Sequence, residues 1–298
     1  MKYGYLSISL FFTCQLMAAE PATSKDELPK TVIRQATNLE AIKKFEQSPT
    51  GWKAGFQSVK DWKAQRGFTP ESQASEQTGI GWFSVNGKNR YKDIQAPGGA
   101  DYVVFEGQHC ADHTQLHGIE ARKACKAGEE VASVDGAFDM IVAFQDDGSA
   151  RVSSVLNAFF QIFERSKEKG WCPAYALFFE REKLLIGAWD DRTAVPHLTL
   201  KRGEWYRIRL TVTLKQQGAV TVVSVWPISL AGKQGEALVS GIVIEHRKGL
   251  QLHGLARSFP VLVGSYTWCV KGKEPFSAAT LMCAYSQDTE QSRKDKKP

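Results

Sequence analysis

Residues 205–226 carry the clearest hydrophobic pattern of the chain, because two strand-like segments meet there across a turn that contains Gly218. In the first segment apolar residues alternate with Arg and Thr, which is the period-two pattern of a strand with one buried face. The sequence therefore predicts a β-hairpin whose polar face, with Arg207 and Arg209, meets solvent or a ligand. The side chains expected on the buried face are Tyr206, Ile208, Leu210, Val212 and Leu214.

Short apolar runs separated by turn residues fill the rest of the chain after Gly79. Turn signals include the pair Asn86 and Gly87 and the run 97–99, Pro-Gly-Gly. About ten strands in this arrangement are typical of an all-β sandwich or barrel. The run 155–163 fits either a strand or a helix, because its apolar residues are also helix-spaced. We expect one β domain over 51–286.

The segment before this domain has a different periodicity. From Asp26 to Phe45 apolar residues recur mostly at three- and four-residue steps, and Ser48, Pro49 and Gly51 follow. These are the spacing and the stop signals of an amphipathic helix. We therefore expect a helical extension over 20–50.

The first nineteen residues have the form of a cleaved secretory signal. Lys2 precedes a mostly apolar run over 3–17 that is too short for a membrane span, and the small residues Ala18 and Ala19 follow it. Lipid attachment at Cys14 is the alternative, although the residues before it are not small. With no later run of about 20 apolar residues, the mature chain is expected to be secreted or periplasmic.

Charge adds little to this picture. The net charge is +6, and much of the excess lies in the last residues, where Arg293, Lys294, Lys296 and Lys297 cluster. A short basic end of this kind is typical of a disordered tail, which we place at 287–298. No basic patch with interleaved aromatic residues is present, so nucleic acid is not an expected partner.

Cysteine is the next chemical lead, because export favours disulfides. Five cysteines remain after removal of the signal, an odd number. The pairs Cys110–Cys125 and Cys269–Cys283 are the simplest arrangement, since each closes a loop of roughly fifteen residues worth about 3 kcal/mol. Cys172 is then a buried free thiol. Spacing alone does not fix the pairing, and Cys172 with one of the other four remains an alternative.

The densest polar cluster lies around residues 106–120 and contains His109, His113 and His117. On a helix the i, i+4 spacing would place all three imidazoles on one face, which suits Zn²⁺ or another transition metal. Cys110 is a candidate fourth ligand, unless a disulfide consumes its thiolate. A disulfide-closed loop, a metal site and a catalytic histidine are the three interpretations of this cluster.

The order of segments from Phe138 to Trp226 resembles the concanavalin A-like lectin/glucanase superfamily, which includes laminin-G-like domains. The matching motifs are AYALFFE, then KLLIGAWD, then HLTLKRGEWYRIRLTV, in which a Gly-x-Trp-Tyr turn precedes a long alternating strand. The resemblance implies a sandwich of two antiparallel sheets with jelly-roll connections. The motifs are structural, so they specify fold better than activity.

The resemblance also implies contact with glycans through a sheet face or the loops at one rim. Sugars offer an apolar face to aromatic rings and hydroxyls to carboxylates and guanidinium groups. Some members of the superfamily hold Ca²⁺ in acidic loops, for which Asp146, Asp147, Asp190 and Asp191 are candidates without a complete ligand set. The candidate sugar-binding residues are Arg207, Arg209, Trp189, Asp190, Asp191 and Arg192.

Catalysis is disfavoured by the motifs that the chain lacks. The superfamily's glucanases carry a Glu-x-Asp-x-x-Glu strand that brings two carboxylates together, and none occurs here. Related jelly-roll polysaccharide lyases use Tyr, His, Arg and Gln on a concave sheet face; the segment 160–163 contains Gln161 but lacks the expected His beside it. No phosphate-binding loop, serine elbow or zinc-protease motif is found.

The sequence therefore predicts an exported, non-catalytic carbohydrate-binding or adhesive β-sandwich. One alternative is a polysaccharide-degrading lyase or glycosidase of the same fold. The other is a structural domain without a small ligand, which contacts other cell-envelope proteins. The enzyme would bring a His or Tyr base together with Arg and a carboxylate in one groove, and the structural domain would have that face covered.

Overall fold

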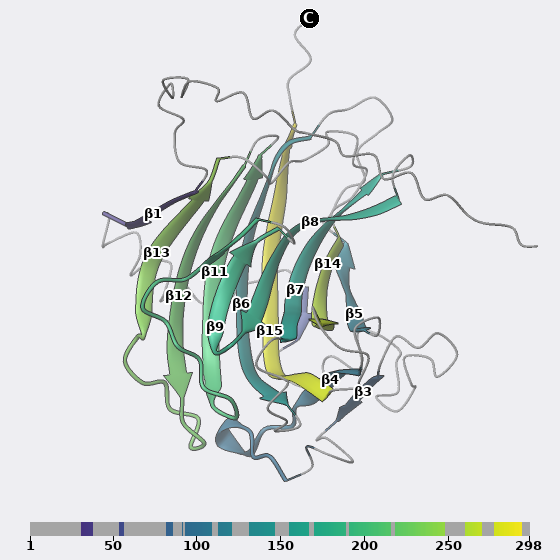
Figure 1. Ribbon diagram of the computed structural model, residues 1–298, viewed down its shortest axis with the longest axis vertical. Helices are drawn as coiled ribbons and strands as arrows, with labels where there is room; N and C mark the ends of the chain where they lie inside the picture. The colour runs from purple at the N-terminus through teal and green to yellow at the C-terminus, as the bar shows by residue number, and fades with distance from the viewer. Residues whose placement is uncertain are drawn as a thin grey trace, which may run out of the picture.

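The protein folds as two antiparallel β-sheets packed face to face, which overlap as two layers in the computed structural model (Figure 1). A 3₁₀ turn at Pro97–Gly99 is the one helical element in the part of the chain that the structure describes. The expected all-β, two-sheet antiparallel sandwich is confirmed. The described residues are 31–37, 54–56, 82–85, 91, 93–108, 113–120, 131–146, 155–166, 170–188, 191–215, 218–247, 260–269 and 277–293.

Sheet A is the larger sheet, with nine strands. Its strands follow the order β1-β13-β12-β11-β6-β15-β4-β3, and β2 pairs with β15 outside this path. Their bounds are β1 (Thr31–Gln35), β2 (Ala54–Phe56), β3 (Trp82–Val85), β4 (Val103–Gln108), β6 (Val131–Asp146), β11 (Trp205–Lys215), β12 (Ala219–Ile228), β13 (Val239–His246) and β15 (Ser277–Arg293).

Sheet B has six strands in the order β10-β9-β8-β7-β14-β5. Strands far apart in sequence, such as β5 and β14, are neighbours in it, so the sheet forms only when distant segments meet. The bounds are β5 (His113–Glu120), β7 (Val155–Ser166), β8 (Gly170–Glu180), β9 (Lys183–Gly187), β10 (Arg192–Ala194) and β14 (Pro260–Cys269).

The predicted hairpin is present as β11 and β12, which pair in register from Trp205 opposite Ile228 to Leu214 opposite Ala219. The turn closes with a hydrogen bond from the Lys215 N–H to the Gly218 carbonyl oxygen, 3.0 Å long. All five apolar side chains expected on one face of β11 are buried, and they belong to the core between the sheets. The alternation therefore predicted both the strand and its buried face.

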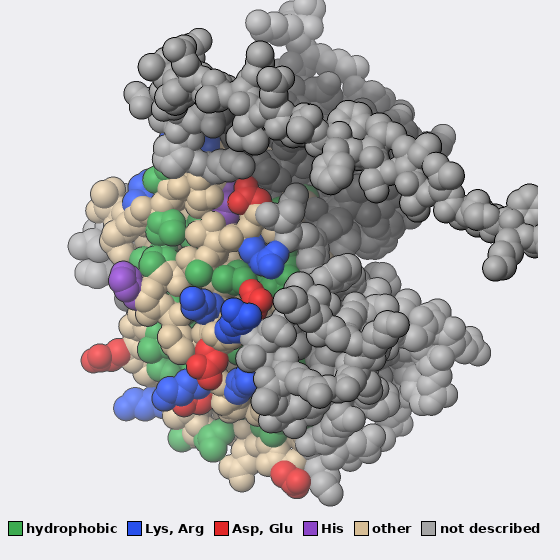
Figure 2. Space-filling view, viewed as in Figure 1, with side chains coloured by type: hydrophobic (Ala, Val, Ile, Leu, Met, Phe, Trp, Pro, Cys, Tyr) green, Lys and Arg blue, Asp and Glu red, His purple; other side chains and the backbone are tan. Residues whose placement is uncertain are grey.

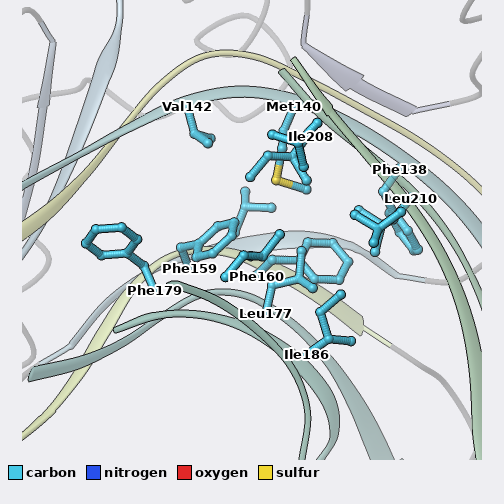
Figure 3. Close-up of a cluster of buried hydrophobic side chains, with 14 of the residues drawn as sticks. Phe138, Met140, Val142, Phe159, Phe160, Leu177, Phe179, Ile186, Ile208 and Leu210 are labelled. Atoms are coloured by element: carbon cyan, nitrogen blue, oxygen red, sulfur yellow. The ribbon is translucent and has the colours of Figure 1, made fainter. Parts of the chain in front are cut away.

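Aromatic side chains fill the space between the sheets. Figure 3 shows residues of β6 and β11 facing residues of β7, β8 and β9. The Phe144 ring stacks on Phe179 with centroids 4.3 Å apart, and Phe138 meets Phe160 edge to face at 4.7 Å. Burying one such ring stabilises the fold by about 1.5–3 kcal/mol relative to exposure, so this layer is the main apolar contribution to the sandwich.

A β-bulge in β7 changes which side chains face the core. The pairing with β8 steps from Ala158 opposite Phe178 to Phe160 opposite Leu177, which leaves Phe159 as an extra residue. Phe159 and Phe160 are both buried in the core. Because side chains alternate along a strand, the extra residue puts Gln161 on the outer face of sheet B with Ala158. The run 155–163 is thus a strand, and its helical alternative is wrong.

The helical extension expected over 20–50 is wrong where the structure describes it. Thr31–Gln35 forms β1, which pairs antiparallel with β13 from Thr31 opposite His246 to Gln35 opposite Ile242. The β-branched residues Thr31, Val32 and Ile33 favour this conformation. Backbone hydrogen bonds to the edge of β13 stabilise the strand more than the local spacing of apolar residues stabilises a helix.

Strands of the sandwich also extend past both predicted domain boundaries. β1 precedes residue 51, and β15 continues through residue 286 to Arg293, so most of the expected tail over 287–298 pairs with β6.

Among the described residues, no helix is long and apolar enough to cross a membrane.

The predicted Cys269–Cys283 disulfide is also wrong, because Cys283 is a free, buried thiol. Its Sγ lies 3.9 Å from the Ile141 carbonyl oxygen in an apolar cluster on the outer face of sheet A, whereas Cys269 ends β14 in sheet B. Burial raises the pKa of the Cys283 thiol to about 12, so the thiol stays protonated and unreactive. Cys110 and Cys125 lie outside the described residues.

The β8–β9 turn yields a stability prediction. Arg181 and Glu182 have φ of 50° and 61°, the left-handed region that costs a residue with a side chain about 1–2 kcal/mol. Glu182→Gly should remove that strain, partly offset by the greater entropy of the unfolded chain. We expect the free energy of unfolding to rise by about 0.5–1 kcal/mol in denaturant titrations. Lys183→Gly, at the first residue of β9, is the matched control and should lower it.

Candidate functional site

The predicted sugar-binding residues do not form one site. Arg207 and Arg209 lie in β11 of sheet A, whereas Asp191 and Arg192 lie at the beginning of β10, the edge strand of sheet B. Trp189 and Asp190 are outside the described residues. The prediction placed these residues together because β10 and β11 are consecutive in sequence, but the chain changes sheets between them.

Arg207 is bound within the protein by a bidentate ion pair. Its Nε donates to Asp139 Oδ1 at 2.9 Å, and its Nη2 also contacts the Asp139 carboxylate. Its Nη1 donates to Gln234 Oε1 at 3.0 Å, and the guanidinium lies 5.7 Å from the centroid of the Trp226 ring. The hydrogen bond to Asp139 raises the pKa of Arg207 despite partial burial. These contacts are those of a structural cation.

Arg209, two residues further along β11, is buried with 2% of its surface exposed. Its position is opposite Asp139 on β6 and Ser224 on β12, both also buried. The expectation that the polar face of the hairpin is open to solvent or a ligand is therefore wrong at its centre, because Arg209 is inside the protein.

The remaining candidates at β10 are partly exposed. The Arg192 guanidinium lies 5.7 Å from the centroid of the Phe178 ring on β8, and the Asp191 carbonyl oxygen accepts a hydrogen bond from the Ala188 N–H at 2.9 Å. Figure 2 shows Lys and Arg side chains interspersed with Asp and Glu on the described part of the surface that faces the viewer. The described surface in this view carries no extended patch of a single charge.

The histidine cluster does not have the helical geometry on which the metal prediction rested. His113 and His117 lie in strand β5, and His109 is outside the described residues. Four residues span about 13 Å along a strand but only about 6 Å along a helix. The stacking of imidazoles on a helical face is therefore lost. No group of three His, Cys, Asp or Glu residues that could hold a metal occurs within the described residues.

The calcium candidates are also separated. Asp146 ends β6 in sheet A, Asp191 lies beside β10 in sheet B, and Asp147 and Asp190 are outside the described residues. A Ca²⁺ site needs six to eight oxygen ligands. The described residues do not bring such a set together.

The register of sheet B instead gathers polar residues at one end of its outer face. On β14, Tyr266 is opposite His113 of β5 and Ala158 of β7. Leu262 is likewise opposite His117 of β5 and Gln161 of β7. Directly opposite residues share a face of the sheet. The positions of two His, one Tyr and one Gln therefore lie on the same face of three adjacent strands.

Both of these rows continue across the whole sheet. The row of Tyr266 is apolar beyond β14, through Ala158, Phe178, Leu185 and Ala194. The second row has one polar residue at each end and a third, Gln161, inside it. Two small residues separate Gln161 from one end, and a leucine separates it from the other. Its members, from β10 to β5, are Arg192, Gly187, Ala176, Gln161, Leu262 and His117.

These residue types suit chemistry on a sugar. Imidazole and phenol groups transfer protons, and a side-chain amide donates and accepts hydrogen bonds. Between the two rows Gln115 of β5 is opposite Gly264 of β14, a position without a side chain. The alternation His113, Gln115, His117 was visible in the sequence; the β14 partners of these positions were not.

A separate depression of about 500 Å³ lies on sheet A, between the beginning of β11 and the 229–235 loop. Trp205, Pro227, Ile228 and Leu230 contribute to its lining, together with Gln234, the acceptor for Arg207. The Trp205 Nε1 is already used by the Gln95 carbonyl oxygen at 2.9 Å. The lining residues that the structure describes include no histidine or tyrosine, so they offer less acid–base chemistry than the residues on the face of sheet B.

No protein-family model and no curated protein matches the sequence. Among solved structures, a family 7 alginate lyase in complex with substrate aligns with a TM-score of 0.40 at 10% identity, over 66% of this chain and 80% of that one. Peanut lectin aligns with a TM-score of 0.37 at 11% identity, over 74% and 96%. Similarity this low adds no functional argument. The two-sheet architecture itself agrees with the concanavalin A-like resemblance.

The Asp139–Arg207 pair yields a prediction for the outer face of sheet A. Asp139→Ala leaves a partly buried guanidinium without its carboxylate, and we expect a loss of about 2–3 kcal/mol in the free energy of unfolding. Asp135→Ala on the same strand is the matched control. It removes an exposed hydrogen bond from Thr213 and should cost less than about 1 kcal/mol. Equal losses in urea titrations would contradict the structural role of Arg207.

Proposed function

We propose that the outer face of sheet B binds a glycan at its β5–β14–β7 end. The observation that carries this proposal is the strand register, which aligns His113 with Tyr266 and His117 with Gln161 across β14. His and Tyr side chains supply donors and acceptors for sugar hydroxyls and ring surfaces for the apolar face of a sugar, whereas Gln161 is buried with 3% of its surface exposed and is not counted as a ligand contact. Arg192, partly exposed at the far end of the His117 row, favours an acidic polysaccharide over a neutral one.

Two features of the chain are consistent with this proposal. The N-terminal pattern predicts export, which would bring the mature protein to envelope or extracellular polysaccharides. On sheet A, the Arg residues first expected to bind sugar are paired or buried instead. Glycan contact is therefore assigned to sheet B alone.

The direct test is a glycan array with the mature protein and its His117→Ala variant. We expect selective binding by the wild-type protein and loss of that signal in the variant. Thr213→Ala, on the outer face of sheet A, is the matched control and should bind normally, with thermal melts showing that both variants fold. Binding that survives His117→Ala but is lost in Thr213→Ala would place the ligand on the wrong sheet.

A second candidate function, cleavage by β-elimination, is favoured by the His113–Tyr266 pair. On a uronate, a base removes the proton at C5, a C4–C5 double bond forms, and the C4–O bond breaks as an acid protonates the departing oxygen. A His and a Tyr on adjacent strands can serve as that base and acid. The segment 160–163 contains Gln161 but no His beside it, so the β5 histidines would have to supply that group.

Ultraviolet absorbance of the new conjugated double bond separates the two functions. An enzyme should generate it from an acidic polysaccharide, and Tyr266→Phe should abolish the rate while array binding persists. Binding without any absorbance change in the wild-type protein would leave the non-catalytic function and exclude the lyase on that polysaccharide.

A further inference from the structure

His246, the last residue of β13, lies where the two sheets meet at one edge of the sandwich. It is opposite Ala219 of β12 and Thr31 of β1 in sheet A. Its side chain is only 1% exposed. The nearest part of sheet B is Gly187 of β9: a Cβ added to this glycine would lie 3.1 Å from the Nε2 of His246. Figure 1 shows β1 and β13 side by side at the left edge of the molecule.

The main chain is packed closely around this residue. A Cβ on Gly218 would be 2.0 Å from the His246 carbonyl oxygen, and a Cβ on Gly187 would be 2.3 Å from the Asp191 carbonyl oxygen. Both glycines have positive φ, 90° and 144°. The imidazole therefore occupies a site whose walls cannot accept an added methyl group without moving backbone.

Neither ring nitrogen of His246 makes a hydrogen bond of standard geometry, although both are buried. Burial lowers the pKa of His246, opposed by the Asp191 charge and by an electrostatic contact with the Ile186 main chain. Burial without hydrogen-bond partners therefore disfavours the protonated imidazole in the folded chain. In the unfolded chain His protonates near its ordinary pKa of about 6.5, so acidification through that range favours states that release the ring to water.

We propose that His246 is an acid-sensitive contact between the sheets, so that its protonation opens the β1–β13 edge away from β9. β1 is the element best placed to detach, because it has five residues, three of them exposed, and pairs only with β13 among the described strands. Local opening generally begins at such weakly packed edges.

Charged residues lie on several of the described elements around His246. Asp191, in the β9–β10 connection, is the acidic group that acts on the ring. Glu245 and Arg247 flank His246 in sequence but form an ion pair with each other at 3.1 Å. On β1, Arg34 is exposed, and on β11, Lys215 is exposed. Asp191 stabilises the protonated ring in the closed state, so Asp191→Asn should increase the opening observed at acid pH.

Hydrogen exchange of the full mature chain at about pH 7.5 and about pH 5.5 tests this inference. After correction for intrinsic exchange, we expect acid to increase exchange selectively in β1, β13 and β9. His246→Gln, which cannot titrate, should abolish that increase. His197→Gln, at an exposed histidine, should leave it intact. Exchange in β1 that ignores pH, or that keeps its pH dependence in His246→Gln, would overturn the proposal.

A second measurement covers the case in which His246→Gln does not fold. The imidazole proton resonances of wild-type His246 can be followed by NMR as the pH falls. We expect a midpoint below the ordinary histidine pKa of about 6.5. Titration of His246 at the value of an exposed histidine would show that the ring is not held neutral by the fold and would equally overturn the inference.

Discussion

The alternation of side chains along antiparallel strands, and its single shift at Phe159, determines what the two faces of sheet B can be. With Phe159 as an extra residue, Phe160 and Ile162 remain in the core while Gln161 moves to the outer face. Without the bulge, strict alternation would place Gln161 between the sheets and an aromatic ring outside. The alignment of Gln161 with His117 across β14 depends on this one residue.

The two outer faces use their polar residues differently. On sheet A the Asp139–Arg207–Gln234 contacts connect β6, β11 and the loop after β12, and Arg209 is buried beside them. Such pairs fix the positions of strands and leave few free donors for a ligand. On sheet B the polar positions His113, His117 and Tyr266 gather at the β5–β14 end of two rows of register, and Arg192 lies at the far end of one of them. This difference is the physical reason to assign ligand contact to sheet B.

Sequence patterns predicted the fold where local alternation and burial agree, as in β11. They failed at β1, because Val32, Ile33 and Ala36 fit both a helix and a strand, and the edge of β13 that decides between them lies over two hundred positions away. They failed for the histidines for the same reason, since i, i+4 spacing is compatible with one face of either element. The burial of Arg209 and the bulge at Phe159 depend on tertiary packing, which spacing cannot reveal.

NMR chemical-shift mapping with an oligosaccharide selected by the array is the most direct measurement of where this protein binds. The account predicts perturbed backbone resonances in β5, β14 and β7, continuing along the row toward Arg192 for longer oligosaccharides. Perturbations confined to β11, β12 and the 229–238 loop would place the ligand on sheet A and contradict the central claim. The same would follow if no acidic oligosaccharide perturbed any resonance of sheet B.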